Sequence, residues 1–246
     1  MKLNIYPSVD ELLQKLAARF VEIANQSITS HGHFSVALSG GSSPEKLYGL
    51  LASTLFSDKV DWNKVYFFFG DERYVSVTDD ASNYKMVKRV LFEPLQINTK
   101  QIFPVNTTLP PVEAALQYME DINRHFDGVP PRFDLILLGL GDNSHTASLF
   151  PHSDILHENA ATIRSVFLPE QQVYRISFTA PLINLAAEVA FLVYGAGKAQ
   201  AVANILEGPH DIENFPAQLI QPIDGIPAWF LDDSAASRLK YTGNPG

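Results

Sequence analysis

The side chains best suited to chemistry are concentrated in one stretch, Phe133–Pro151, which reads FDLILLGLGDNSHTASLFP. An apolar run that opens with an acid, Asp134–Leu138, stops at two glycines, and a crowd of polar residues follows: Asp142, Asn143, Ser144, His145 and Thr146. Because histidine gains or loses a proton near neutral pH, His145 is a candidate acid–base group. Taken alone, such a cluster favours a helix N-cap beside a surface histidine; the motifs described below favour a functional site instead.

A second candidate is the turn Ser39-Gly40-Gly41-Ser42-Ser43-Pro44-Glu45, which follows a short apolar strand, Phe34–Leu38. Glycines, hydroxyls and a proline in the first helical turn predict a tight strand-to-helix connection. The free backbone N–H groups of Gly40, Gly41 and Ser42 would suit an anion at the helix N-terminus. The alternative is an ordinary connection capped by a serine.

Three further charged groups follow or lie within predicted strands. Val65–Phe69 ends in Gly70-Asp71-Glu72-Arg73-Tyr74, which is either a solvated or a functional loop. Arg175 belongs to the strand Val173–Thr179, and Lys198 follows the strand Ala190–Tyr194. Arg175 as an outward-facing strand residue and Lys198 as a surface lysine are the alternatives.

The elements that position these residues alternate between strand and helix, with Asp134–Leu138 resembling a strand buried on both faces. A capping box at Ser8–Glu11 opens the first helix. The other predicted elements are helices at Asn83–Phe92, Val112–Phe126 and Ala199–Leu206, and strands at Gln101–Val105 and Trp229-Phe230-Leu231. We therefore expect an α/β protein: one doubly wound, mostly parallel, Rossmann-like sheet with helices on both faces, forming a single domain over residues 1–246. Ligands of such sheets bind beyond the carboxyl ends of the strands.

Composition narrows the classes of function. The formal net charge is −9, which argues against nucleic acid and anionic membranes as partners, so an anionic ligand would need a local cationic pocket. Apolar runs are far shorter than the roughly 20 residues of a membrane span, and no signal peptide is visible. The absence of cysteine removes disulfides, thiol nucleophiles and thiolate metal sites, and it permits the cytoplasmic location that we expect.

Several common motifs are incomplete. Gly139-Leu140-Gly141 lacks the third glycine of a dinucleotide fingerprint, and Gly197-Lys198-Ala199 lacks the first glycine and the hydroxyl of a P-loop. Ser144 and Ser148 lie outside any G-x-S-x-G elbow. The histidines in and after this stretch do not have metal-ligand spacing on one helical face: His145, His152 and His157. The sequence thus predicts no metal and no nucleotide or flavin cofactor.

The assembled motifs resemble the 6-phosphogluconolactonase family, within the larger group that includes glucosamine-6-phosphate deaminase. The resemblance covers nearly the whole chain. It rests on Ser39–Pro44, Gly70–Arg73, His145–Pro151, Arg175, Gly197–Ala199 and Trp229–Asp232. The first block is shared with the deaminases, and the second and third resemble the lactonases.

The resemblance implies hydrolysis of 6-phospho-D-glucono-1,5-lactone to 6-phospho-D-gluconate, a step of the oxidative pentose phosphate pathway, without a cofactor. His145 would be the general base, Arg73 a donor to the oxyanion or to a sugar oxygen, and Asp71 a partner of the sugar hydroxyls. The phosphate would lie on Gly40, Gly41 and Ser42, with its charge met by Arg175 and Lys198.

The chain departs from its family just before the histidine, where aspartate and glycine are usual and Asn143 and Ser144 stand here. This change bears on how His145 is oriented and charged. A deaminase-like enzyme and a sugar-phosphate-binding relative without turnover therefore stay as alternatives. Ammonia release would identify the first, and absence of lactone hydrolysis the second.

Overall fold

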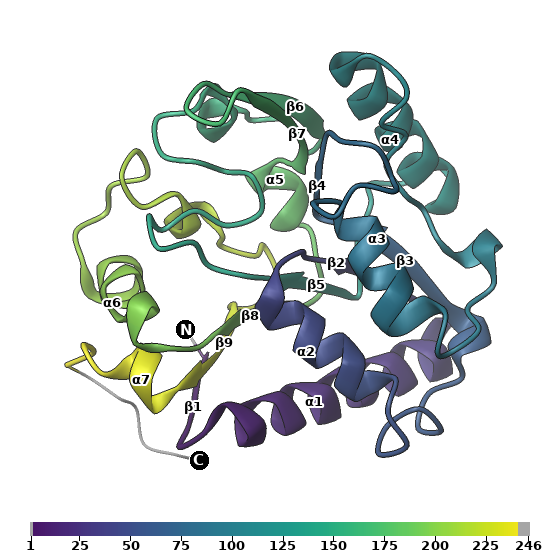
Figure 1. Cartoon of the computed structure of the whole chain (residues 1–246), viewed down its shortest axis with the longest axis horizontal. Helices are drawn as coiled ribbons and strands as arrows, with labels where there is room; N and C mark the ends of the chain where they lie inside the picture. The colour runs from purple at the N-terminus through teal and green to yellow at the C-terminus, as the bar shows by residue number, and fades with distance from the viewer. Residues whose placement is uncertain (1, 241–246) are drawn as a thin grey trace.

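A computed structural model describes residues 2–240, which form a large parallel sheet and a small antiparallel sheet with helices packed around them (Figure 1). All five strand pairs of the large sheet are parallel. In spatial order its strands are β1 (Lys2–Tyr6), β9 (Ala228–Asp232), β8 (Val189–Val193), β5 (Leu135–Leu138), β2 (Phe34–Leu38) and β3 (Val65–Phe69). This arrangement confirms the predicted α/β class.

Alternate residues of the large sheet enter two separate hydrophobic cores, because successive side chains of a strand point to opposite faces. In β2, Val36 and Leu38 belong to one core, and Ala37 belongs to the other. The first core is closed by α1 (Val9–His31), α2 (Ser42–Leu51), and α3 (Asn83–Val87), which continues as a π-helical turn over Lys88–Phe92. The second core is closed by α4 (Pro111–His125), α5 (Ala180–Ile183), α6 (Ala199–Glu207), α7 (Asp233–Ala236) and the small sheet.

The first long helix begins as the sequence predicts. Ser8 is its N-cap, and the Ser8 hydroxyl accepts a hydrogen bond from the Glu11 backbone N–H at 3.2 Å. The buried face carries Leu12, Leu16 and Phe20 at helical spacing. The helix ends at Gly32, whose φ of 90° is in the left-handed region that favours glycine.

The small sheet was not predicted. It consists of β4 (Asp71–Arg73), β7 (Val173–Phe178) and β6 (Ile163–Leu168) in that order, all antiparallel. β4 consists of three charged residues, and such a composition is typical of a loop rather than of a strand. It becomes a strand because β7 offers it a partner, which is a tertiary effect that local pattern does not contain.

The predicted strand over Gln101–Val105 is wrong. Thr99–Gln101 form a 3-10 turn, and Ile102 alone makes an isolated bridge, to Phe67 of β3. Pro104 has no N–H for a ladder, so pairing stops there. β1 was also missed, and it forms by pairing in parallel with β9 from the far end of the chain.

The order of the strands creates a switch point between β2 and β5. From β2 the chain moves outward to β3, whereas from β5 it moves the other way, to β8 and then β9. Loops that leave β2 and β5 therefore diverge, and a crevice opens beyond the carboxyl ends of these strands. Within residues 2–240, no helix has the length and apolar character needed to cross a membrane.

Candidate active site

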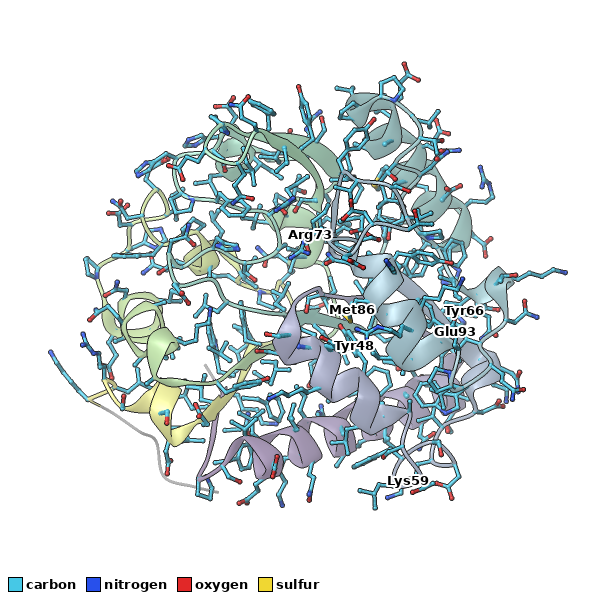
Figure 2. The ribbon with its side chains drawn as sticks, in the orientation of Figure 1. Tyr48, Lys59, Tyr66, Arg73, Met86 and Glu93 are labelled. Atoms are coloured by element: carbon cyan, nitrogen blue, oxygen red, sulfur yellow. The ribbon has the colours of Figure 1, made fainter. Side chains whose placement is uncertain are left out.

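A cavity of about 410 Å³ lies at this switch point. Its walls come from the loops that follow three adjacent strands: Ser39–Pro44 after β2, Gly139–Gly141 after β5, and Leu192–Tyr194 at the end of β8. The small sheet closes another side through Asp71, Arg73 and Arg175. Figure 2 labels Arg73 on β4 and Tyr48 on α2, two elements that border the cavity.

The N-terminus of α2 presents free backbone donors to the cavity. Gly41 is the N-cap, with φ of 103°, and no side chain within residues 2–240 caps the helix. The N–H groups of Ser42 and Ser43 have no partner within the helix, and Pro44 has no N–H. These donors and the helix dipole favour an anion, as predicted for this turn.

Two buried side chains hold the turn in place. The Tyr48 hydroxyl accepts a hydrogen bond from the Ser39 N–H at 3.0 Å and donates one to the Ser39 carbonyl at 2.9 Å. The amide of Asn83 lies against Gly40, where a Cβ atom would come within 1.8 Å of Asn83 Oδ1. The same amide donates to the Asp71 carbonyl at 2.9 Å. Glycine at position 40 is therefore required by this close contact.

The three charged side chains of β4 point to alternate faces of the strand. Asp71 and Arg73 share the face that lines the cavity, and Glu72 points to the other face. There the Glu72 carboxylate accepts backbone hydrogen bonds from Arg73 at 2.8 Å, Asn83 at 2.7 Å and Tyr84 at 2.8 Å. Burial raises the pKa of Glu72 to about 7, against these hydrogen bonds. Glu72 thus fastens β4 to the start of α3.

Arg73 and Arg175 are direct cross-strand neighbours in β4 and β7. The Arg73 guanidinium donates to the Ala81 carbonyl at 2.7 Å, and that of Arg175 donates to the Gln171 side chain at 3.0 Å. Burial, and then the charge of Arg73, lower the pKa of Arg175 below its ordinary value. Like charges placed opposite each other on neighbouring strands are destabilising. An anion in the cavity would relieve this repulsion.

Lys198 lies on the opposite wall, at the end of a short 3-10 helix, Ala196–Lys198, that leads into α6. Its ammonium contacts Asp142 Oδ1 at 2.5 Å. Asp142 is largely exposed, so this pair is accessible to water and contributes little to stability. Lys198 therefore borders the cavity as predicted, with a carboxylate partner that the sequence did not indicate.

His145 reaches the cavity from the loop after β5. Its Nδ1 lies 2.5 Å from Asn143 Oδ1. Because that amide oxygen only accepts hydrogen bonds, Nδ1 carries the proton and Nε2 keeps a free lone pair. Burial is the largest influence on the ring and lowers the pKa of His145 to about 4. His145 is therefore neutral near pH 7 and able to accept a proton.

The loop that carries His145 is tightly folded. Ser144 and Ala147 have φ of 67° and 46°, in the left-handed region that non-glycine residues seldom adopt. The conformation at position 144 would suit glycine, the residue expected there from the resemblance described above. At Gly141, a Cβ atom would lie 2.1 Å from His145 Nδ1, so glycine is needed for the imidazole to pack against this backbone.

A buried hydrogen-bond network joins this loop to the small sheet. The Ser148 hydroxyl donates to Asp71 Oδ2 at 2.7 Å, and the Ser148 N–H donates to the Ser177 hydroxyl at 3.2 Å. Ser177 in turn pairs with Asp71 across β4 and β7. The negative charge of Asp71 is thereby held near His145, whose pKa it raises against the effect of burial.

The structure brings eight of the nine predicted site residues to one cavity: Gly40, Gly41, Ser42, Asp71, Arg73, His145, Arg175 and Lys198. The ninth, Asn143, does not line the cavity, and its side-chain oxygen contacts Nδ1 of His145. Sequence reasoning missed Ser148, Phe150 and Gln171 as parts of the site. The first two belong to the quoted block His145–Pro151, and Gln171 carried no signal. Among residues 2–240, no cluster of three His, Asp or Glu side chains has a metal-binding arrangement.

The fold and the cavity define an α/β protein with a small cationic site beyond the carboxyl ends of its parallel strands. Residues 7–229 match the model of the family described as glucosamine-6-phosphate isomerases/6-phosphogluconolactonase. The chain belongs to this family.

Individual relatives agree with the lactonase branch. A 6-phosphogluconolactonase of Synechocystis is 39% identical over 95% of this chain and 99% of its own length. One from Aggregatibacter actinomycetemcomitans is 34% identical over 95% and 98%. The solved structure of 6-phosphogluconolactonase from Trypanosoma cruzi has a TM-score of 0.85 at 28% identity, covering 98% of this chain and 97% of that chain.

Proposed function

We propose that this chain hydrolyses 6-phospho-D-glucono-1,5-lactone to 6-phospho-D-gluconate. The observation that carries the proposal is a neutral His145 whose Nδ1 is bound to Asn143 and whose ring borders a cavity with Arg73 and Arg175, neither of which forms a salt bridge within residues 2–240. The choice of substrate is supported by the two relatives described above, which are named 6-phosphogluconolactonases.

The chemistry follows from a substrate whose carbonyl is already electrophilic. His145 Nε2 accepts a proton from water while the water oxygen attacks the lactone carbonyl carbon. Arg73 donates to the oxyanion that develops, or to a sugar oxygen, and Asp71 accepts from the sugar hydroxyls. The bond from the carbonyl carbon to the ring oxygen then breaks, and the proton held by His145 passes to that oxygen.

The 6-phosphate is the second anchor. Its oxygens accept from the backbone at Gly40, Gly41 and Ser42, and its charge is met by Arg175 and Lys198. These groups supply locally the positive charge that a chain of net charge −9 lacks. The same negative net charge argues against nucleic acid and anionic membranes as partners. We also propose a cytoplasmic location.

The test compares three compounds. We expect kcat/KM for the phosphorylated lactone to exceed that for plain gluconolactone by about 100-fold or more, because charge-assisted contacts contribute roughly 1.5–3 kcal/mol each. All rates are corrected for spontaneous ring opening. Equal values for the two lactones would refute the phosphate anchor. Release of ammonia from glucosamine 6-phosphate without lactone hydrolysis would instead favour the deaminase.

A further inference from the structure

The ring of Phe150 lies directly on the imidazole of His145. The two ring centroids are 4.1 Å apart and the planes differ by 21°, so the rings are stacked. The imidazole also packs against Gly141, where no Cβ fits. Its Nδ1 is bound to Asn143, so contacts with three residues restrict the ring, and the Nε2 edge makes no hydrogen bond within residues 2–240.

Phe150 also separates two hollows of the molecule. One is the cavity of about 410 Å³ that holds the site residues. The other is a groove of about 780 Å³ lined by Pro151, Ile155 and Phe167, among others. Phe150 and Gln171 line both, and Asn143 lines the groove alone. Phe150 therefore lies at the boundary between the cavity that His145 lines and the open groove.

We propose that Phe150 is a positioning residue for His145: its ring fixes the plane of the imidazole and shields it from the groove, so that a neutral Nε2 faces the substrate. This inference rests on the proposed function, because it concerns the base of that reaction. A flat ring is needed for the stacking, whereas a branched aliphatic side chain of similar polarity would leave gaps for water.

Charged groups around His145 do not by themselves keep it neutral. Asp71 of β4 and Asp142 of its own loop favour the protonated ring, and Lys198 and Arg175 from the opposite walls disfavour it. These opposing charges partly cancel, and exclusion of water is the largest influence on the pKa of His145. Phe150 is the side chain that stacks on the ring and thereby contributes to that exclusion.

The decisive experiment is an NMR titration of His145 in the folded protein without substrate, with its signal assigned from His145→Gln. In Phe150→Leu we expect the pKa of His145 to rise from about 4 toward its ordinary value near 6.5, by about one unit or more. The acidic limb of kcat/KM should move to higher pH with it. We expect kcat to fall by about 10-fold or more, with KM little changed, because the base is misaligned.

Two variants serve as controls. Phe150→Tyr keeps the ring and should keep both the pKa of His145 and the acidic limb. Phe167→Leu makes the same chemical change in the same groove. The Phe167 ring lies tilted against Tyr174 rather than against His145, so this substitution should change neither the pKa nor the acidic limb. If Phe150→Leu does not fold, Phe150→Met replaces it, because Met is apolar and lacks a flat ring.

An unmoved pKa of His145 in folded Phe150→Leu or Phe150→Met would overturn the inference. An equal shift in Phe167→Leu would also overturn it, since the effect would then belong to the groove as a whole. Absence of lactone turnover in the unsubstituted protein would refute the proposed function and not the shielding of His145, because the titration needs no substrate.

Discussion

Replacing Asn143 by aspartate tests how His145 is charged, because Asn143 is the side chain bound to His145 Nδ1. The Asn143 side chain lies 2.5 Å from His145 Nδ1 and is neutral. Aspartate has the same shape and the same acceptor oxygen, so the orientation of the ring should persist. What changes is one negative charge beside the imidazole, which favours its protonated form.

The size of the shift follows from Coulomb's law. The carboxylate charge and the delocalised imidazolium charge would be about 4 Å apart, an interaction of about 1 kcal/mol in water and about 4 kcal/mol near a protein surface. Since residue 143 is exposed and His145 is partly buried, we expect the interaction between these two charges to be about 1–3 kcal/mol. This corresponds to about one to two pKa units. The pKa of His145 should therefore rise from about 4 to about 5–6.

The assay is the pH profile of kcat/KM for the phosphorylated lactone. The base must be neutral to accept a proton, so the acidic limb of Asn143→Asp should move to higher pH by the same one to two units. Activity near pH 7 should be kept or increased. Asn143→Ala is the control. It removes the hydrogen-bond acceptor without adding charge, so the acidic limb of its kcat/KM profile should not move to higher pH. An unmoved limb in folded, active Asn143→Asp would show that residue 143 does not contact His145 during the reaction.

Three further predictions concern other parts of the molecule. His145→Ala should lower kcat by about 10²–10⁴, the usual contribution of a general base, and chelation by EDTA should leave the rate of the unsubstituted protein unchanged; loss of activity restored by zinc would refute a metal-free mechanism. Arg175→Met should lower kcat/KM for the phosphorylated lactone by about 10- to 100-fold and leave plain gluconolactone unaffected, whereas equal losses would place Arg175 away from the phosphate. Burial, and then the charge of His33, lower the pKa of His125 to about 4, so unfolding takes up a proton there and stability should fall as the pH drops from about 6.5 to 4. Urea midpoints across that range should decline less in His125→Gln, and an equal decline would contradict the assignment.

The sequence predicted the elements whose pattern is local. Ser8 and Glu11 identify the start of α1, and the turn after β2 was predicted from its glycines and Pro44. The run before Gly139 was predicted as a buried strand, because a strand covered on both faces is continuously apolar. Placing polar loops after parallel strands was enough to expect one shared site, since the carboxyl ends of such strands meet at one edge.

Only the tertiary structure decided which side chains meet. β4 is a strand because β7 pairs with it, and that pairing sets Arg73 beside Arg175, about 100 residues away in the chain. It also turns Glu72 away from the cavity, which three adjacent charges in a sequence do not reveal. The burial that lowers the pKa of His145 likewise arises only in the folded structure. Burial and cross-strand register arise from the packing of distant segments, so residue type and spacing alone do not determine them.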